Sequence, residues 1–116
     1  RGNTSKKIVE MVRKQGAKNV YFASAAPPVR YQNVYGIDMP ATKELVAHGK
    51  TVEEIKLFIG ADELIYQDIE DLRMAAHIGN PNITSFEDSV FTGKYCAGKI
   101  SKEYLSELEN NRASKE

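Results

Sequence analysis

The feature that most constrains this chain is an uncharged run over residues 20–26 (VYFASAA), in which hydrophobic or small side chains occupy both alternating faces. A strand with one solvated face alternates polar and apolar residues, whereas a strand inside a parallel sheet is apolar on both faces. We therefore predict a buried strand of a mostly parallel sheet, covered on both sides. Ligands of such sheets bind beyond the carboxyl ends of the strands, so residues 27–40 (PPVRYQNVYGIDMP) are the first candidate for function.

The segment before this strand is predicted to be a helix into which residues 1–5 run directly, with Asn3 or Thr4 as its cap. The apolar face of this helix is made by Ile8, Met11 and Val12, and Gly16 ends it in a left-handed conformation. The order of a glycine loop, a helix and a buried strand is typical of an α/β unit.

Helix and strand signals alternate along the rest of the chain. A short helix is predicted over residues 42–47, closed by His48 and Gly49, and a second helix from the capping box at residues 51–54 (TVEE) to Gly60. A strand is predicted over residues 63–66, followed by a helix that is capped by Asp68, runs from Ile69 to about Ile78 and is ended by Gly79. The last predicted elements are a possible strand near Val90 and Phe91 and a helix from Ser101 with a frayed tail from Asn110. The predicted inward residues of the three longer helices are Val52, Ile55, Phe58 and Ile59, then Leu72, Ala75 and Ala76, then Tyr104, Leu105 and Leu108. This order predicts a layered α/β fold.

Composition excludes several classes of function. Sixteen basic and sixteen acidic residues cancel, so the chain has no electrostatic footprint for nucleic acid or an anionic membrane. The single cysteine, Cys96, excludes an internal disulfide, and we expect a cytoplasmic, reducing location. Because the chain begins with Arg1 rather than Met, we also expect it to be a segment of a longer protein.

The first five residues have the composition of a phosphate site. A glycine, hydroxyl side chains and a helix N-terminus provide converging donors and a positive helix end in the segment Arg1, Gly2, Asn3, Thr4 and Ser5. Many helices with such a start bind nothing, so a purely structural interpretation stays open.

For the other polar residues, the sequence pattern indicates either a structural role or no single role. Arg30 and Asp38 flank the central loop and either contact a ligand or pair with neighbours. His48 and His77 have no metal-ligand spacing, and each is expected near a helix end. Cys96 lacks a neighbouring basic group that would activate it, so we expect it to be inert.

Four motifs together resemble glutamine amidophosphoribosyltransferase: residues 1–5 (RGNTS), 24–40 (SAAPPVRYQNVYGIDMP), 59–62 (IGAD) and 91–95 (FTGKY). The resemblance implies a fragment of a type I phosphoribosyltransferase fold, with a mostly parallel sheet flanked by helices. Residues 1–95 would form the C-terminal part of the phosphoribosyltransferase domain, and residues 96–116 a C-terminal helix and a frayed tail.

The resemblance also implies the reaction of the parent enzyme. Members of the family release ammonia from glutamine and use it to displace pyrophosphate from C1 of phosphoribosyl pyrophosphate. The product is 5-phosphoribosylamine, the first intermediate of purine synthesis. Magnesium, with ligands mostly outside this chain, inhibitory purine nucleotides and a homo-oligomeric assembly are implied in the same way. Asn33, Glu87 and Val90 replace cysteines of the members that hold an iron–sulfur cluster, so no cluster is expected.

Site residues carried over from the family fall in three places. Arg1, Gly2, Asn3, Thr4 and Ser5 resemble the end of the loop that holds the 5′-phosphate, with Asn3 where many members have Thr. Asp38 and Pro40 match positions at the substrate or regulatory nucleotide pocket. Leu45 matches a position on the ammonia path. The acidic pair that contacts the ribose hydroxyls would precede Arg1, so we expect no turnover by the fragment itself and assign no catalytic or metal-binding residue.

Two other hypotheses remain open on the sequence. The first is a non-catalytic, regulatory α/β module that binds a mononucleotide phosphate through the same glycine loop. The second is a purely structural piece whose glycine loop is disordered without the preceding strand. Preference for a nucleotide over phosphoribosyl pyrophosphate would favour the regulatory module, and protection of residues 2–5 from proteolysis would argue against the structural piece.

Overall fold

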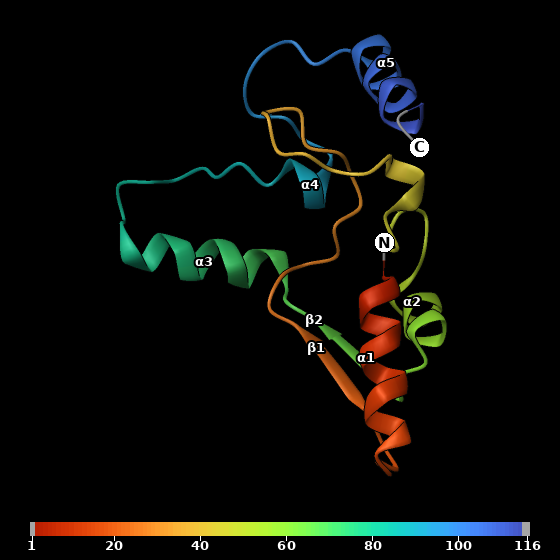
Figure 1. Ribbon diagram of the computed structural model, residues 1–116. Coiled ribbons are helices and arrows are strands. Elements are labelled where there is room, and N and C mark those ends of the chain that lie inside the picture. The colour runs from red at the N-terminus through yellow and green to blue at the C-terminus, as the bar shows by residue number, and fades with distance from the viewer. Residues whose placement is uncertain (1, 115–116) are drawn as a thin grey trace.

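The structure, a computed structural model, describes residues 2–114. Its elements are α1 (Asn3–Lys14), β1 (Tyr21–Ser24), the 3₁₀ helix η1 (Thr42–Glu44), α2 (Val52–Ile59), β2 (Glu63–Tyr66), α3 (Ile69–Gly79), α4 (Ser89–Thr92) and α5 (Lys102–Ala113) (Figure 1). Within the described part of the chain, no helix is long and apolar enough to span a bilayer.

The two strands form a parallel pair that carries the core of the molecule. Phe22 is in register with Leu64, and Tyr21 with Glu63. Helices α1 and α2 pack on one face of this pair (Figure 1). The buried cluster between them consists of Val9, Val20, Ala47, Ile55, Ile59, Ala61 and Leu64. The predicted α/β class and the parallel pairing are therefore confirmed.

The prediction that β1 is covered on both sides is wrong for this chain. Tyr21 is 67% exposed, and Ile65 on the same face of β2 is 58% exposed. Both packed helices lie on the opposite face, and α3 leaves the end of β2 instead of returning over the sheet (Figure 1). The apolar pattern of residues 20–26 thus indicates a two-sided strand, but only one side has a partner here.

The helix predicted before β1 is present as α1, but it differs in its cap and its buried face. Its N-cap is Gly2, which has no capping side chain, and Asn3 is already helical. Val9 is the buried residue, because the side of α1 that meets α2 passes through it, whereas Ile8 and Met11 are 42% and 58% exposed. The left-handed conformation predicted for Gly16 is confirmed, at a φ of 97°.

The strongest helix signal in the sequence is confirmed in detail. The Thr51 side chain accepts from the backbone N–H of Glu54, and the Glu54 carboxylate accepts from the N–H of Thr51, which is a complete capping box. Gly60 ends α2 in the left-handed region. Ile55 and Ile59 are buried as expected, while Val52 and Phe58 stay about two-fifths exposed (39% and 40%).

The second half of the chain departs from several predictions. The helix expected over residues 42–47 is only the one-turn η1 followed by turns. The strand expected near Val90 and Phe91 is the short helix α4. A hydrophobic pair is too short to distinguish strand from helix, and here no neighbouring strand edge is available.

Helices α3 and α5 also differ from expectation. Asp68 caps α3 as predicted, but Gly79 belongs to the helix, and Ala75 and Ala76 are exposed rather than inward. Helix α5 is capped by Ser101 as expected and continues to Ala113 without the predicted fraying from Asn110.

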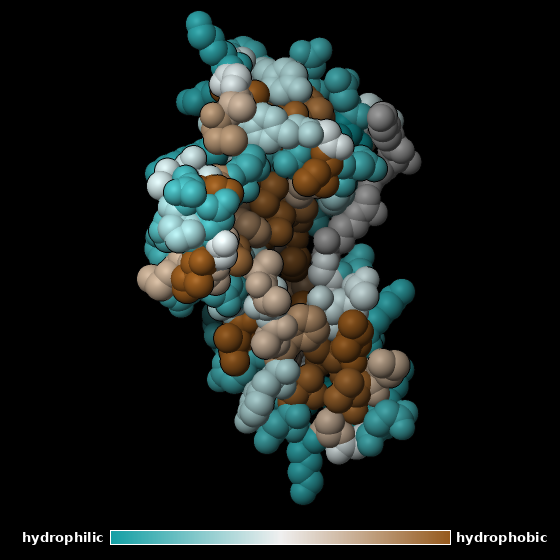
Figure 2. All heavy atoms as spheres, turned by 90° about the vertical axis from the view of Figure 1, so that its left-hand side faces the viewer, coloured by the Kyte–Doolittle hydropathy of each residue, from teal (hydrophilic) through white to brown (hydrophobic). Residues whose placement is uncertain are grey.

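The molecule is extended rather than spherical. Its radius of gyration is 16.5 Å, whereas a compact domain of this length has about 13 Å. Figure 2 views the side on which α3 lies and shows hydrophobic surface gathered in its middle and lower parts. Large exposed hydrophobic residues of the chain include Tyr21, Ile65, Met74 and Ile78.

Candidate functional site

The start of α1 is fixed by close contacts around Gly2. Gly2 has a φ of 79°, and a Cβ atom on it would lie 2.8 Å from Cγ2 of Val46 and 3.1 Å from Cε1 of Phe58. The first helical hydrogen bond runs from the N–H of Lys6 to the Gly2 carbonyl at 3.0 Å. Only glycine combines this backbone conformation with this approach. Arg1, the first residue of the predicted phosphate loop, lies outside the described residues.

The electrostatics of this helix start suit an anion. The first turn of α1 contains no acidic residue, so the positive end of the helix dipole is not neutralised there. Asn3 and Thr4 are exposed, and Ser5 is half-buried. Lys6 lies over the ring of Phe58 with its ammonium nitrogen 5.7 Å from the centroid. Helix α1 runs antiparallel to β1, which directs its N-terminus toward the carboxyl end of the sheet (Figure 1).

Arg30 belongs to the framework of the central loop, residues 27–40. Its Nη1 donates to the carbonyl oxygens of Ala47 and Lys50, both at 2.6 Å. Nδ1 of His48 lies 2.9 Å from the Arg30 carbonyl oxygen. The interpretation that Arg30 pairs with neighbours is therefore confirmed. His48 has a structural role, as expected, because its ring contacts the backbone of the central loop.

The motif at residues 91–95 supports the central loop from one side. The backbone N–H groups of Arg30 and Tyr31 both donate to the Val90 carbonyl, at 2.9 and 3.0 Å. The Tyr95 hydroxyl donates to the Gln32 carbonyl at 2.9 Å, and burial raises the pKa of Tyr95, which keeps this donor protonated. A Cβ atom on Gly93 would lie 3.1 Å from the Tyr31 ring. Two motifs about 60 residues apart thus form one unit.

Asn33 shapes the loop by a local hydrogen-bonded turn. It is 3% exposed, and its Oδ1 accepts from the N–H groups of Tyr35 at 2.9 Å and Ile37 at 3.2 Å. The part of the loop that precedes Asn33 is hydrogen-bonded directly to Val90. The absence of an iron–sulfur cluster stays a prediction.

Asp38 and Pro40 line one side of a cavity of about 640 Å³. Its other side is made by α5, with Tyr104, Leu108, Asn111 and Arg112. The volume is in the range of small-molecule sites. Among the described residues that line it, none comes from residues 2–5, so the two predicted parts of the site do not share this cavity.

Leu45 follows Glu44, which lines the cavity, and precedes Val46, which lies against Gly2 at the start of α1. It is 6% exposed, and its N–H closes η1 by donating to the Thr42 carbonyl at 3.0 Å. The next residue, Val46, is the one that contacts Gly2. One short segment therefore touches both predicted parts of the site.

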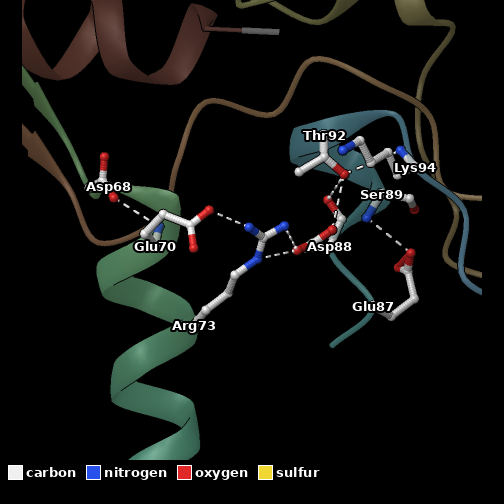
Figure 3. A network of polar contacts seen from close by, with 8 residues as sticks. All are labelled: Asp68, Glu70, Arg73, Glu87, Asp88, Ser89, Thr92 and Lys94. Atoms are coloured by element: carbon white, nitrogen blue, oxygen red, sulfur yellow. Dashed lines mark hydrogen bonds and ion pairs between the residues drawn. The ribbon is translucent and has the colours of Figure 1, made fainter. Parts of the chain in front are cut away.

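Figure 3 shows a polar network at the carboxyl ends of the strands, between α3 and α4. Arg73 donates from Nε to Asp88 at 2.7 Å and also binds Glu70. The hydrogen bond to Asp88 is the main cause that raises the pKa of Arg73. Thr92 donates to Asp88 at 3.0 Å, which extends the network into the 91–95 motif. A second cavity, of about 240 Å³, lies beside it and is lined by Pro27, Pro28, Gln67, Asp68, Ile69, Phe91 and Thr92.

Sequence reasoning missed the part that α5 plays. The sequence pattern predicts the helix but carries no signal that it lines a cavity with Asp38.

Residues 2–114 contain no group of three His, Cys, Asp or Glu side chains that could hold a metal ion. The described residues alone therefore do not form a magnesium site.

No protein-family model matches the chain. Curated proteins match nearly all of it: the chain is 54% identical over 97% of its length to amidophosphoribosyltransferases of Haemophilus influenzae and Escherichia coli. It is 49% identical over 98% of its length to that of Saccharomyces cerevisiae. The chain spans 22% of the length of each of these relatives.

Solved structures agree. A glutamine phosphoribosylpyrophosphate amidotransferase from Bacillus subtilis, described as complexed with ADP and GMP, aligns with 92% of this chain and 24% of its own, with a TM-score of 0.71 and 34% identity. A structure described as the allosteric regulatory enzyme of purine biosynthesis aligns with 94% of this chain and 24% of its own, with a TM-score of 0.72 and 32% identity.

Fold and site together define an α/β segment of the kind found in phosphoribosyl pyrophosphate amidotransferases. By sequence, the chain is a segment of the amidophosphoribosyltransferase family. The resemblance found in the four motifs is thereby confirmed.

Proposed function

We propose that this chain is the C-terminal part of the phosphoribosyltransferase domain of an amidophosphoribosyltransferase. The whole enzyme would transfer ammonia from glutamine to C1 of phosphoribosyl pyrophosphate and release pyrophosphate, with Mg²⁺ held mostly by residues outside this chain. The observation that carries the proposal is 54% identity over 97% of the chain to enzymes of that name.

Within this proposal, the start of α1 is the cradle for the 5′-phosphate. Support comes from the backbone conformation at Gly2, which only glycine tolerates, and from a first turn without acidic residues. Asp38 and Pro40 serve the substrate or the regulatory nucleotide in the 640 Å³ cavity, and Leu45 lines the ammonia path. Much of the chemistry is positioning plus neutralisation of the leaving pyrophosphate. Residues 96–116 form the C-terminal extension of the domain, and a homo-oligomeric, cytoplasmic enzyme is the expected context.

The proposal is tested by expressing the complete gene that encodes this chain and measuring the intact mass and the activity of its product. We expect a protein several times longer than this chain that forms phosphoribosylamine from glutamine. The 116-residue chain alone should form none, even with ammonia. A complete gene product of 116 residues would overturn the proposal.

A regulatory nucleotide-binding module is the second candidate, and the cavity beside Asp38 is the observation that favours it. Titration of the 116-residue chain with GMP and, separately, with phosphoribosyl pyrophosphate distinguishes the two. GMP binding at Asp38 without any binding of phosphoribosyl pyrophosphate, combined with an inactive complete protein, would support the module.

A further inference from the structure

Helix α5 is hydrogen-bonded to the central loop and to η1, two segments that are far from the helix in sequence. At the first point, Arg112 donates to the Asn33 carbonyl at 3.0 Å, and the Gln32 side chain donates to the Leu105 carbonyl at 3.0 Å. At the second, the Glu109 carboxylate accepts from the N–H groups of Thr42 at 2.8 Å and Lys43 at 3.4 Å. The irregular loop between these points carries Asp38 and Pro40.

The second contact supplies hydrogen-bond acceptors for the first N–H groups of η1. The first N–H groups of a helix have no partner within it, and a three-residue 3₁₀ helix has little stability of its own. Glu44 accepts from the N–H of Ala41 at 3.2 Å, which leaves the next two donors for Glu109. Two carboxylates from segments 65 residues apart therefore cap this single turn.

The cap is connected to Leu45 by one further hydrogen bond. The residue held by Glu109, Thr42, accepts at its carbonyl from the N–H of Leu45 at 3.0 Å. Leu45 is then followed by Val46, which packs on Gly2. A shift of η1 moves Leu45 with it, because Leu45 follows Glu44 directly and its N–H is bonded to Thr42.

We propose that Glu109 is a positioning residue that sets the place of Leu45 and thereby the transfer of ammonia between the two half-reactions. This inference rests on the proposed function, in which Leu45 lines the ammonia path. Glu109 acts through the backbone of η1 and contacts no substrate.

The test uses the complete enzyme that contains this chain, with Glu109→Ala and Glu109→Gln beside a control, Glu107→Ala. Glu107 is an exposed carboxylate on the same helix. Phosphoribosylamine formation is measured with glutamine and, separately, with ammonium salt. Loss of folded enzyme lowers both rates equally, so the ratio of the two rates reports on positioning alone.

We expect Glu109→Ala to lower the glutamine-to-ammonia ratio by about tenfold, since misplacement below 1 Å has effects of this size. Glu109→Gln keeps one acceptor oxygen and should recover part of the ratio, and Glu107→Ala should leave it unchanged. A ratio that stays at the wild-type value in Glu109→Ala, with both rates present, overturns the positioning role but not the proposed function. Absence of both rates in the wild-type enzyme overturns the proposed function and this role with it.

A second measurement tests the structural step directly in the complete enzyme that contains this chain. Amide hydrogen exchange at Thr42 and Lys43 should be faster in Glu109→Ala than in wild type and unchanged in Glu107→Ala. Equal exchange in all three proteins would show that the carboxylate does not hold the turn, and would overturn the inference.

Discussion

The guanidinium of Arg13 and the carboxylate of Asp62 join the end of α1 to the residue that precedes β2, with Nη2 and Oδ2 2.7 Å apart. The same oxygen accepts from the backbone N–H of Val20 at 2.7 Å, and Arg13 also donates to the Gly60 carbonyl at 2.9 Å. Gly60 and Asp62 belong to the motif at residues 59–62, so this motif has a structural explanation. It aligns the start of both strands with α1.

This arrangement predicts a pH-dependent stability. The Val20 N–H and then the Arg13 guanidinium lower the pKa of Asp62 below its ordinary value. A carboxyl group whose pKa is lower in the folded state stabilises the fold above its unfolded pKa, and that contribution is lost as the pH falls through the folded pKa. Asp62→Asn should therefore be less stable than wild type to urea at neutral pH, with a smaller difference at about pH 3.

Glu107→Gln, which changes an exposed carboxylate, is the control for general charge effects. A difference between wild type and Asp62→Asn that does not change with pH would contradict the assignment of the pKa shift to this contact.

The contact between Gly2 and Val46 predicts that Gly2→Ala loosens the first turn of α1. The substitution adds strain from a φ of 79° and a clash at 2.8 Å, together about 1–3 kcal/mol. Gly49→Ala is the matched control, because Gly49 also has a positive φ, of 65°, but no atom within 4 Å of the added Cβ. Amide exchange at Lys6, whose N–H bonds to Gly2, should rise in Gly2→Ala and not in Gly49→Ala.

Removing the clash gives an independent check. Val46→Ala should restore part of the protection at Lys6 in the Gly2→Ala background. No recovery would mean that backbone strain alone accounts for the effect.

The buried hydroxyl of Ser89 predicts that replacing this serine by alanine does not destabilise the protein. Ser89 is fully buried, and its Oγ has no hydrogen-bond partner among residues 2–114. Removing an unsatisfied buried group is neutral or stabilising, so Ser89→Ala should change the free energy of unfolding by about 0 to +1 kcal/mol. Ser24→Ala, which removes a hydroxyl that donates to the Ala26 carbonyl at 2.9 Å, should cost about 1 kcal/mol in the same urea titration. A larger loss in Ser89→Ala than in Ser24→Ala would argue that Ser89 has a polar partner.

The network in Figure 3 predicts that Arg73 anchors α3 to α4. Arg73→Lys loses the two-pronged contact with Asp88, and α3 has no buried residue to compensate. Amide exchange in α3 should become faster, while β1 and β2 stay protected. Glu70→Gln, which weakens only the exposed pair on the same helix, should have a smaller effect. An equal loss of protection in the strands would show that α3 is part of the core.

Local signals in the sequence predicted those elements that their own residues stabilise. The capping box of α2, the Asp68 cap of α3, the Ser101 cap of α5 and the left-handed Gly16 all depend on residues within one or two turns. The four motifs likewise identified the family, because each is a continuous run of residues. Sequence reasoning also placed His77 near a helix end, where the structure has it in the last turn of α3, whereas for Arg30 it left a ligand contact and pairing with neighbours open.

The tertiary structure decided everything that depends on residues far apart in the chain. The open face of β1, the helix at Val90 and the cavity wall made by α5 all follow from which segments meet in space. The hydrogen bonds that α5 makes with the central loop and with η1 join residues 66 to 80 positions apart. No local pattern encodes such a pairing, because capping and periodicity extend over a few residues, whereas the positions of Asp38 and Leu45 are set by contacts between whole elements.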